Sequence, residues 1–385
     1  MNYQSPPASG PSEENRTRLS ASPGRPEADL HIQKMIVIAL IGAVVFVLLI
    51  AGISAGKQGM LSANASRHFR EGSDHCGRKE YKEAEQDLRA AIHIKPNDAD
   101  YQSRLGDILY EEAKYAAAAA AYRAAVHLDP TNAYPHNYLG AALQEDNKTD
   151  EAIREYREAV RLDTEDAVYA SNLGNALYGQ GKYTEAEQSY REAIKRKPDD
   201  AEYHADLAEA LLDQKGPQKA DQAIAAYRES VRLAPDKGLY HQDLAFLYVD
   251  RKRYGDAEIE GREAVRLQPD DASFHANLSR TLYLEKRLPD ARAEMIKAIR
   301  LDAKNPRYYG HAADIDVKLH EYQLAEVEYR HAVQLNGKAA RYHASLAGVL
   351  RLRGKTKEAD QEDARAKALR PRPKPGRDAA IDKEP

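Results

Sequence analysis

The amino-acid sequence predicts an all-α protein: a right-handed α-solenoid of nine helix–turn–helix repeats, preceded by one transmembrane helix. Three observations predict this fold. The chain repeats a 34-residue pattern, most visibly in residues 138–166 and 172–200. Small residues and prolines recur at fixed places in that pattern, and a long uncharged stretch precedes it. The repeat decides the architecture, since 385 residues without one would suggest two or three globular domains.

Residues 1–34 are rich in proline, serine, glycine and charge. This composition buries too little apolar surface to offset the entropy of ordering, so a disordered tail is predicted. Residues 35–55 carry no charge and, as a helix, would span roughly 31 Å, enough for a bilayer core of about 30 Å. They are predicted to cross the lipid bilayer. Residues 56–64 contain two glycines and are predicted to form a linker.

Two alternatives to a membrane anchor stay open at this point. A cleaved signal peptide is suggested by the small pair Ala63 and Ala65, although the segment that precedes the apolar stretch is long for a signal peptide. A buried core helix would need an apolar partner, which the neighbouring sequence does not offer. The length and composition favour an uncleaved, single-pass anchor.

The charges that flank the anchor favour one orientation only slightly. Four basic residues precede it within about 20 positions and three follow it, so the N-terminus is expected in the cytoplasm and the repeats outside it. The reverse orientation would place the repeats in the cytoplasm. The basic residues counted are Arg16, Arg18, Arg25 and Lys34 before the anchor, and Lys57, Arg67 and Arg70 after it.

From residue 65 the chain divides into nine rows, called repeats 1–9 below. The fifth row has three extra residues around 214–219, and residues 372–385 form a second predicted disordered tail. The rows are 65–98, 99–132, 133–166, 167–200, 201–237, 238–271, 272–305, 306–339 and 340–371.

Each row has the pattern of two helices joined by a turn. The eighth position is glycine, alanine or serine in all nine rows, and alanine recurs twelve positions later. Small residues at fixed places let two helices approach closely. Proline closes six rows, where it prevents a helix from continuing. A single such hairpin cannot bury its apolar face, so stacked repeats must form the core.

The rows resemble the tetratricopeptide repeat family. Residues 138–160 (YLGAAL…EAIREYREAV) and 172–194 (NLGNALY…EAEQSYREAI) are close to that family's consensus, and the resemblance covers about four-fifths of the chain. It departs at Glu71 and His75 in repeat 1 and at Asp316 in repeat 8, where apolar residues are usual. The resemblance implies a concave face that binds extended peptides.

The sequence offers little support for catalysis, cofactors, metals or nucleic acid. It lacks the phosphate-binding loop, the nucleophile elbow and the zincin motif. A single cysteine, Cys76, cannot form a thiolate zinc cage, and a net charge of −4 gives no basic footprint for nucleic acid. Asp316 beside His311 is the only faint catalytic candidate. No enzyme activity, cofactor, metal or nucleic-acid partner is therefore predicted.

Histidine occupies the fourth position in six of the rows. Equivalent positions in stacked repeats lie too far apart to share one metal ion, and packing is the preferred explanation. The six are His68, His136, His204, His241, His275 and His343.

The resemblance implies a groove lined by positions 2, 5, 9, 12 and 13 of each row. These positions share one helical face. Their charges predict an acidic front, a basic back and an apolar patch between them, which suits an extended peptide. The predicted groove residues are Asp100, Asp107, Tyr110, Glu111, Tyr134, Glu145, Tyr178, Glu202, Glu209, Leu212, Asp213, Leu239, Phe246, Val249, Asp250, Arg280, Tyr283, Arg307, Lys318, Arg341 and Arg351.

The predicted function is a membrane-anchored scaffold or assembly factor that binds partner proteins or peptides in this groove. A targeting receptor for precursor proteins and an extracytoplasmic glycan or cell-wall binder are the alternatives. The receptor would differ by releasing its client, and the glycan binder would use the groove tyrosines.

Overall fold

The computed structural model describes residues 26–370, with side chains at Met35 and from residue 39 onward, and within that range it contains helices and no strand. The helices are α1 (Pro26–Gly77), α2 (Tyr81–Ile94), α3 (Ala99–Glu111), α4 (Tyr115–Leu128), α5 (Ala133–Glu145), α6 (Thr149–Leu162), α7 (Ala167–Gly179), α8 (Tyr183–Arg196), α9 (Ala201–Asp213), α10 (Pro217–Leu233), α11 (Gly238–Asp250), α12 (Tyr254–Leu267), α13 (Ala272–Leu284), α14 (Leu288–Leu301), α15 (Pro306–Lys318), α16 (Tyr322–Leu335), α17 (Ala340–Leu352) and α18 (Thr356–Leu369). The all-α prediction is confirmed.

The chain divides into two compact units, Met1–Pro96 and Asn97–Pro385. In the first unit, α1 runs for 52 residues and α2 packs against its C-terminal part. Part of α1, Ala39–Gly77, is long and apolar enough to cross a membrane, judged by length and composition alone.

The structure corrects one boundary in this unit. Residues 56–64, expected to form a linker, are helical and continue α1 into repeat 1. A glycine costs only about 1 kcal/mol in a helix interior, so Gly56 and Gly59 do not interrupt a helix supported on both sides. Residues 26–34, assigned to the tail, are also helical. The predictions for residues 1–25 and 372–385 lie outside the described residues.

The second unit contains α3–α18, arranged as eight helix pairs that follow the predicted repeats. The first helix of six of these pairs begins at an Asp or Asn whose side chain accepts a backbone N–H, a standard N-cap. Each pair turns through one residue with a left-handed backbone, and in repeat 5 Gly216 follows with a second positive φ. The caps are Asp98, Asn132, Asp166, Asp200, Asp271 and Asn305. The left-handed turn residues are Ala113, Asn147, Gly181, Lys215, Lys252, Lys286, His320 and Gly354.

The three extra residues of repeat 5 lengthen its second helix. α10 begins at Pro217, after Gly216 with φ +112°, and has 17 residues where the other second helices have 14. The helix pair is otherwise preserved, so the insertion does not shift the repeats that follow.

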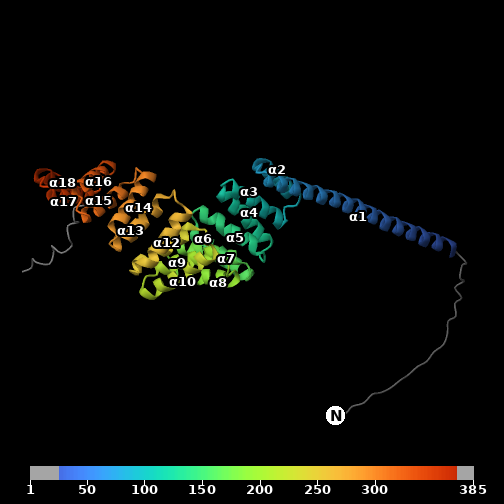
Figure 1. Ribbon diagram of the computed structural model, residues 1–385. Helices are drawn as coiled ribbons and strands as arrows, with labels where there is room; N and C mark the ends of the chain where they lie inside the picture. The colour runs from blue at the N-terminus through green and yellow to red at the C-terminus, as the bar shows by residue number, and fades with distance from the viewer. Residues whose placement is uncertain (1–25, 371–385) are drawn as a thin grey trace, which may run out of the picture. The chain divides into compact units, whose positions relative to one another are not determined.

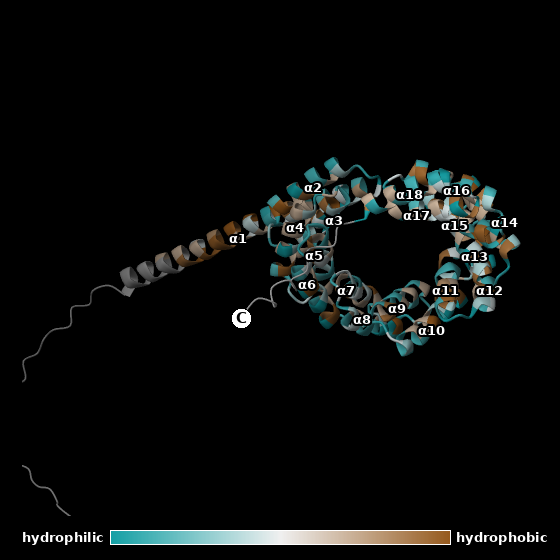
Figure 2. Ribbon diagram, turned by 90° about the vertical axis from the view of Figure 1, so that its left-hand side faces the viewer, coloured by the Kyte–Doolittle hydropathy of each residue, from teal (hydrophilic) through white to brown (hydrophobic). Residues whose placement is uncertain are grey.

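Within the second unit the helix pairs wind around a common axis. In Figure 2 the odd-numbered helices from α3 to α17 lie on the inside of the coil and the even-numbered helices on the outside. The chain passes counter-clockwise from α3 through α9 and α13 to α17, and Figure 1 shows that the α18 end faces the viewer of Figure 2. The winding is therefore right-handed, as predicted.

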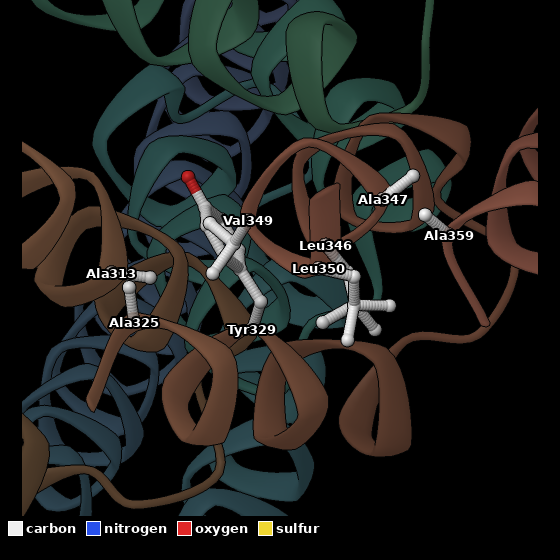
Figure 3. Close-up of a cluster of buried hydrophobic side chains, with 8 residues drawn as sticks. All are labelled: Ala313, Ala325, Tyr329, Leu346, Ala347, Val349, Leu350 and Ala359. Atoms are coloured by element: carbon white, nitrogen blue, oxygen red, sulfur yellow. The ribbon is translucent and has the colours of Figure 1, made fainter. Parts of the chain in front are cut away.

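The small eighth position allows the two helices of a repeat to pack closely. A Cβ atom added to Gly106, Gly140 or Gly174 would lie 2.6 to 2.9 Å from the ring of a tyrosine on the second helix of the same repeat. Those tyrosines are nearly inaccessible to solvent. Farther along, alanine at this position is part of a continuous core, seen in Figure 3. That cluster consists of Ala313, Ala325, Tyr329, Leu346, Ala347, Val349, Leu350 and Ala359.

Candidate peptide-binding groove

All 21 predicted groove residues lie on the inner helices α3–α17, and none of them is buried. Their surroundings differ strongly from one end of the second unit to the other. An acidic region lies on α9 and α11, an exposed apolar pocket follows on α11 and α13, and arginines lie on α15 and α17.

The acidic region is more concentrated than the sequence pattern suggested. Glu202, Glu209 and Asp213 were predicted, and the structure adds two aspartates, Asp206 and Asp243, at the sixth position of repeats 5 and 6. These five residues are called the inner acidic cluster. The charged groups that act on Asp206 are Glu202, Glu209 and Asp200, without a cation among them.

Burial and mutual repulsion perturb the inner acidic cluster. Burial, followed by the neighbouring carboxylates, raises the pKa of Asp206 to about 7. Burial and Glu209 raise the pKa of Asp243 to about 6. Burial and Asp213 also raise the pKa of Glu209. Asp213 accepts a hydrogen bond of 2.6 Å from the hydroxyl of Tyr178, the only one of the five with such a donor among residues 39–370.

The apolar pocket lies next to this cluster. Phe246 and Val249 of α11 line it together with Phe274 and Arg280 of α13. Phe246 is 49% exposed, and Leu239, about two helical turns earlier on α11, is 55% exposed. The guanidinium carbon of Arg280 lies 5.5 Å from the centre of the Phe246 ring, within the range of a cation–π contact. A charged group therefore borders the apolar pocket.

The basic end has two further pockets, which share His311 and Asp314 of α15. Arg280 and Tyr283 line one, and Arg307 and Arg341 line the other. Asp314 accepts a hydrogen bond from the Tyr329 hydroxyl. Burial lowers the pKa of His311, and the nearby arginines lower it further against the attraction of Asp314. His311 therefore favours its neutral form.

Two predicted groove charges are engaged inside the protein. Asp107 accepts hydrogen bonds from the hydroxyls of Tyr122 (2.8 Å) and Tyr134 (2.9 Å) and lies 3.2 Å from Arg104, again a sixth-position residue. Arg351 forms ion pairs with Asp360 and Asp363 of α18, at 3.2 Å for the former. The acidity of repeat 2 and the basicity of repeat 9 are thus partly compensated within the structure.

The remaining predicted groove residues sit on the same inner helices. Tyr110 packs edge-on against Tyr115, with 5.3 Å between ring centres. Leu212 is half-buried. Exposed side chains are those of Asp100, Glu111, Glu145, Asp250 and Lys318.

Carboxylates on the outer helices have the opposite environment. Glu326 is 4% exposed and is contacted by Arg330 (2.9 Å), Lys355 (2.8 Å) and Arg353. Burial alone would raise its pKa, but the hydrogen bonds from Lys355, Arg330 and Arg353 outweigh burial and lower it. Glu187 and Glu258 occupy the same column in repeats 4 and 6 and have a lowered pKa for the same reason. Glu187, Glu258 and Glu326 are called the outer carboxylates.

The faint catalytic candidate is corrected by the structure. Asp316 is fully buried and forms an ion pair with Arg292 of α14, whereas His311 lines the basic pockets beside Asp314. Arg292 stands in the column that holds the outer carboxylates in repeats 4, 6 and 8, so this column carries a cation here and pairs with the buried aspartate. Asp316 and His311 do not form an acid–base pair.

Four of the six histidines in this column are buried, as packing predicts, whereas His68 and His204 are partly exposed. The buried four also form specific hydrogen bonds. In repeats 3, 6, 7 and 9 the ring Nδ1 pairs with a glutamate on the second helix of the same repeat, and Nε2 pairs with a backbone carbonyl in the loop before the first helix. We call this arrangement the histidine tie. Its members are His136–Glu155, His241–Glu260, His275–Glu294 and His343–Glu362, with Nδ1 to oxygen distances of 2.5 to 2.8 Å. The carbonyls belong to Pro130, Pro235, Pro269 and Gly337.

Sequence reasoning missed the sixth position of the inner helices. It lies four positions after position 2 and three before position 9, on the same helical face, so the spacing alone could have included it. The omission mattered because Arg104, Asp206, Asp243 and His311 all occupy it.

The family models that match this chain both describe the tetratricopeptide repeat. Models described as "Tetratricopeptide repeat" match residues 171–238, 217–272 and 243–306, and a model described as "TPR repeat" matches 106–147 and 145–181. Together they span residues 106–306, more than half of the chain. No curated protein is significantly similar to the chain in sequence.

One solved structure with a TM-score above 0.5 shows the same fold at low sequence identity, and two others are similar with lower scores. The C-terminal part of a TPR repeat-containing protein from Cytophaga hutchinsonii has 19% identity and a TM-score of 0.54, covering 62% of this chain and 97% of that one. The pilF protein of Pseudomonas aeruginosa has 23% identity and a TM-score of 0.47, covering 56% and 97%. YrrB, described as a TPR protein with an unusual peptide-binding site, has 18% identity and a TM-score of 0.44, covering 52% and 97%.

Proposed function

Because the chain belongs to the tetratricopeptide repeat family, whose members act as protein-interaction scaffolds, we propose that it holds partner proteins at a membrane through an extended segment bound on its inner helices. The segment would carry a lysine- or arginine-rich stretch, an apolar side chain and an acidic stretch in linear order. The inner acidic cluster carries this proposal, since it lies directly beside an exposed apolar pocket.

The inner acidic cluster is the strongest support because its charges repel one another without compensation. The raised pKa values of Asp206 and Asp243 show that ionisation is unfavourable there. A cationic side chain from a ligand would favour the ionised form and lower both values. The binding energy would therefore come partly from relieving repulsion that already exists in the free protein.

The apolar pocket supplies an anchor point for the segment. Exposed large apolar side chains such as Leu239 and Phe246 commonly mark interaction sites when they cluster. A buried aromatic or aliphatic side chain in the pocket would fix the register, and the charges on either side would select partners. Arg307 and Arg341 would then face the acidic stretch of the segment.

The membrane part of the proposal depends on α1. Its apolar portion meets the length and composition of a membrane span, and we place the repeats on the extracytoplasmic side from the flanking charges. Protease added to intact cells, after opening of any outer membrane, should digest the repeats. Protection until the bilayer is breached would place them in the cytoplasm and overturn this orientation. Recovery of the repeats in the soluble fraction, separated from residues 1–65, would show a cleaved signal.

Peptide binding provides the central test. A fluorescent peptide with a basic block, a central phenylalanine and an acidic block should bind more tightly than a peptide of the same composition with alternating charges. Neutralising Glu202, Asp206 and Glu209 together (to Gln, Asn and Gln) should weaken binding at least about tenfold, as expected for the loss of close charge pairs. Glu187→Gln is the matched control, because it removes a carboxylate from an outer helix. Equal binding of both peptides, or equal loss in both variants, would contradict the proposal.

A precursor receptor would use the same groove and differ in its kinetics. Release of a bound segment within seconds on addition of a downstream partner would favour a receptor over a static scaffold. The glycan alternative has weaker support, because two of its tyrosines, Tyr134 and Tyr178, donate their hydroxyls to Asp107 and Asp213. Binding of a glycan array with undetectable peptide binding would nevertheless favour it.

A further inference from the structure

Repeat 1 contains an incomplete version of the histidine tie. Nδ1 of His68 lies 3.0 Å from Oδ1 of Asp87 on α2, which is the same column pairing found in the later repeats. The second half of the tie is missing. The carbonyl at the equivalent place belongs to Ser62, which lies inside α1 and accepts a hydrogen bond from the Ser66 hydroxyl. The imidazole of His68 is thus held from one side only.

Two further potential ligands replace apolar residues around this pair. Glu71 and His75 occupy the seventh and eleventh positions, where the other repeats mostly place leucine. Glu71 Oε2 lies 3.7 Å from His68 Nδ1, and one ligand atom each from His68, Glu71 and Asp87 fall within 4.8 Å of one another. His75 Nε2 lies 3.6 Å from the other oxygen of Asp87.

The spacing of His68, Glu71 and Asp87 matches ligands that surround a small divalent ion, and His75, which faces the other oxygen of Asp87, would turn toward this group to become the fourth ligand. Zinc binds histidine nitrogen and carboxylate oxygen at about 2.0 to 2.2 Å, which places ligand atoms of a tetrahedral site about 3.3 to 3.6 Å apart. Two neutral imidazoles and two carboxylates also balance the charge of the ion. The side chains are 23 to 48% exposed, so an ion can enter from solvent.

The ring of His75 is oriented as in known metal sites. Its Nδ1 lies 2.6 Å from Glu80, which leaves Nε2 directed at Asp87. A carboxylate bound to the far nitrogen of a ligating histidine fixes its ring orientation and raises its basicity. Nη2 of Arg78 lies 3.0 Å from the same Nδ1, and Nε of Arg78 lies 2.9 Å from Glu80. The metal-binding state of the ring is the one in which Nδ1 carries its proton and donates it to Glu80. If repeat 1 only capped the end of the solenoid, it would need polar side chains here, but not three further potential metal ligands beside the carboxylate of Asp87.

We propose that His68, Glu71, His75 and Asp87 bind a divalent transition-metal ion, with zinc as the best fit to the two-nitrogen, two-oxygen set. The site lies wholly within the first unit. The bound ion joins α1 to α2 on the Nδ1 side of His68, the side that faces a glutamate in a complete tie. Asp87 lies on α2 and the other three residues on α1, so the spacing of residues along one helix did not predict the site.

The test is zinc binding by the full-length, detergent-solubilised chain without a histidine tag. Competition with a chromophoric chelator should show one equivalent bound with micromolar or tighter affinity. His68→Ala and Asp87→Asn should each weaken binding at least about thirtyfold, and Glu80→Gln about tenfold, as for outer-sphere partners of histidine ligands. Circular dichroism checks that each variant is folded.

Two control variants make the result specific. His275→Ala removes a complete tie from repeat 7, whose ring nitrogens are both engaged, and should leave zinc binding unchanged. Cys76→Ser should also retain binding. Failure to bind zinc above adventitious levels, or equal binding by folded His68→Ala and wild-type chains, overturns the proposal. Loss of binding in Cys76→Ser alone would also overturn it, by showing a different ligand set.

Discussion

The inner acidic cluster and the outer carboxylates contain the same chemical group in opposite surroundings. Glu326 on α16 is almost inaccessible and is contacted by three cationic side chains, and its pKa is lowered. Asp206 on α9 is surrounded by other carboxylates, and its pKa is raised to about 7. The first arrangement stabilises the contact between neighbouring repeats. The second destabilises the free protein, as expected where side chains serve a ligand rather than the fold.

The largest expected effect is the loss of stability on removal of one of the outer carboxylates. Glu326→Ala would leave Arg330, Arg353 and Lys355 without their shared carboxylate. Loss of one partner from a buried ion-pair network should lower the free energy of unfolding by about 2–4 kcal/mol. Urea unfolding followed by circular dichroism measures it. Glu209→Ala is the matched control and should change stability by less than about 0.5 kcal/mol, because no cation loses a partner. Equal losses of unfolding free energy in Glu326→Ala and Glu209→Ala would show that the outer and inner carboxylates do not differ in their contribution to stability.

The pH dependence of stability should separate the two groups of carboxylates. The folded chain holds protons on Asp206 up to about pH 7 and on Asp243 up to about pH 6, whereas unfolded aspartates release them near 3.9. Stability therefore falls as pH rises from about 4 to 7, by about 2 kcal/mol after allowance for solvent screening. The outer carboxylates act in the opposite sense: their contribution is present above about pH 4.5 and is lost as pH falls further.

A double variant isolates the aspartates in that measurement. His241 also affects the profile, because its hydrogen bond to Glu260 raises its pKa and gives stability that is lost as pH rises past it. Asp206→Asn with Asp243→Asn should flatten the profile between pH 4 and 7 and leave the histidine contribution at higher pH. A profile that is unchanged in the double variant would contradict the assigned origin.

Neutralising one member of the inner acidic cluster should stabilise the protein and weaken its binding of the basic peptide. Asp206→Asn keeps the side-chain shape and removes repulsion with Glu202 and Glu209, so it should stabilise the chain by about 1 kcal/mol at pH 7.5. The same variant should bind the basic peptide more weakly. Thermal unfolding and fluorescence anisotropy on one sample measure both effects. Destabilisation by Asp206→Asn would show that this carboxylate serves the fold.

The smallest effect is expected at an exposed ion pair between outer helices. Arg157 and Glu185 lie 2.7 Å apart, but their side chains are 51% and 49% exposed. Such pairs contribute about 0–1 kcal/mol, so Arg157→Ala should change stability by less than about 0.5 kcal/mol. A loss comparable to that of Glu326→Ala would mean that burial is not what distinguishes the outer carboxylates.

The repeat architecture could be predicted almost completely from the sequence, because its determinants are periodic and local. The small eighth position and the turn residues recur in every repeat, and proline recurs at the end of most repeats. The helical continuation through Gly56 and Gly59 could not be predicted, because a small local cost was overruled by helix on both sides.

The candidate site could be predicted less completely from the sequence, because it depends on contacts between different repeats. The partner of Asp316, Arg292, lies 24 residues earlier in a different repeat, and no local pattern announces it. The charge order of the groove could be expected from the sequence, but its concentration on α9 and α11 depends on how neighbouring helices bring the sixth position toward the ninth. The raised pKa values of Asp206 and Asp243 follow from that proximity and from burial.

The histidine tie has a mechanical consequence. Each complete tie braces two helices of one repeat against the loop that arrives from the preceding repeat, so it resists bending at that joint. Repeat 4 has Ala170 in place of the histidine, and His204 in repeat 5 contacts only the carbonyl of Pro198. Repeats 2 and 8 also lack the histidine, with Gln102 and Tyr309 at its place, but among repeats 2–9 only repeats 4 and 5 are consecutive repeats without a complete tie. Bending should therefore be easiest there, beside the acidic stretch. A load pulling on a bound segment would open the coil first at the place where the segment is held.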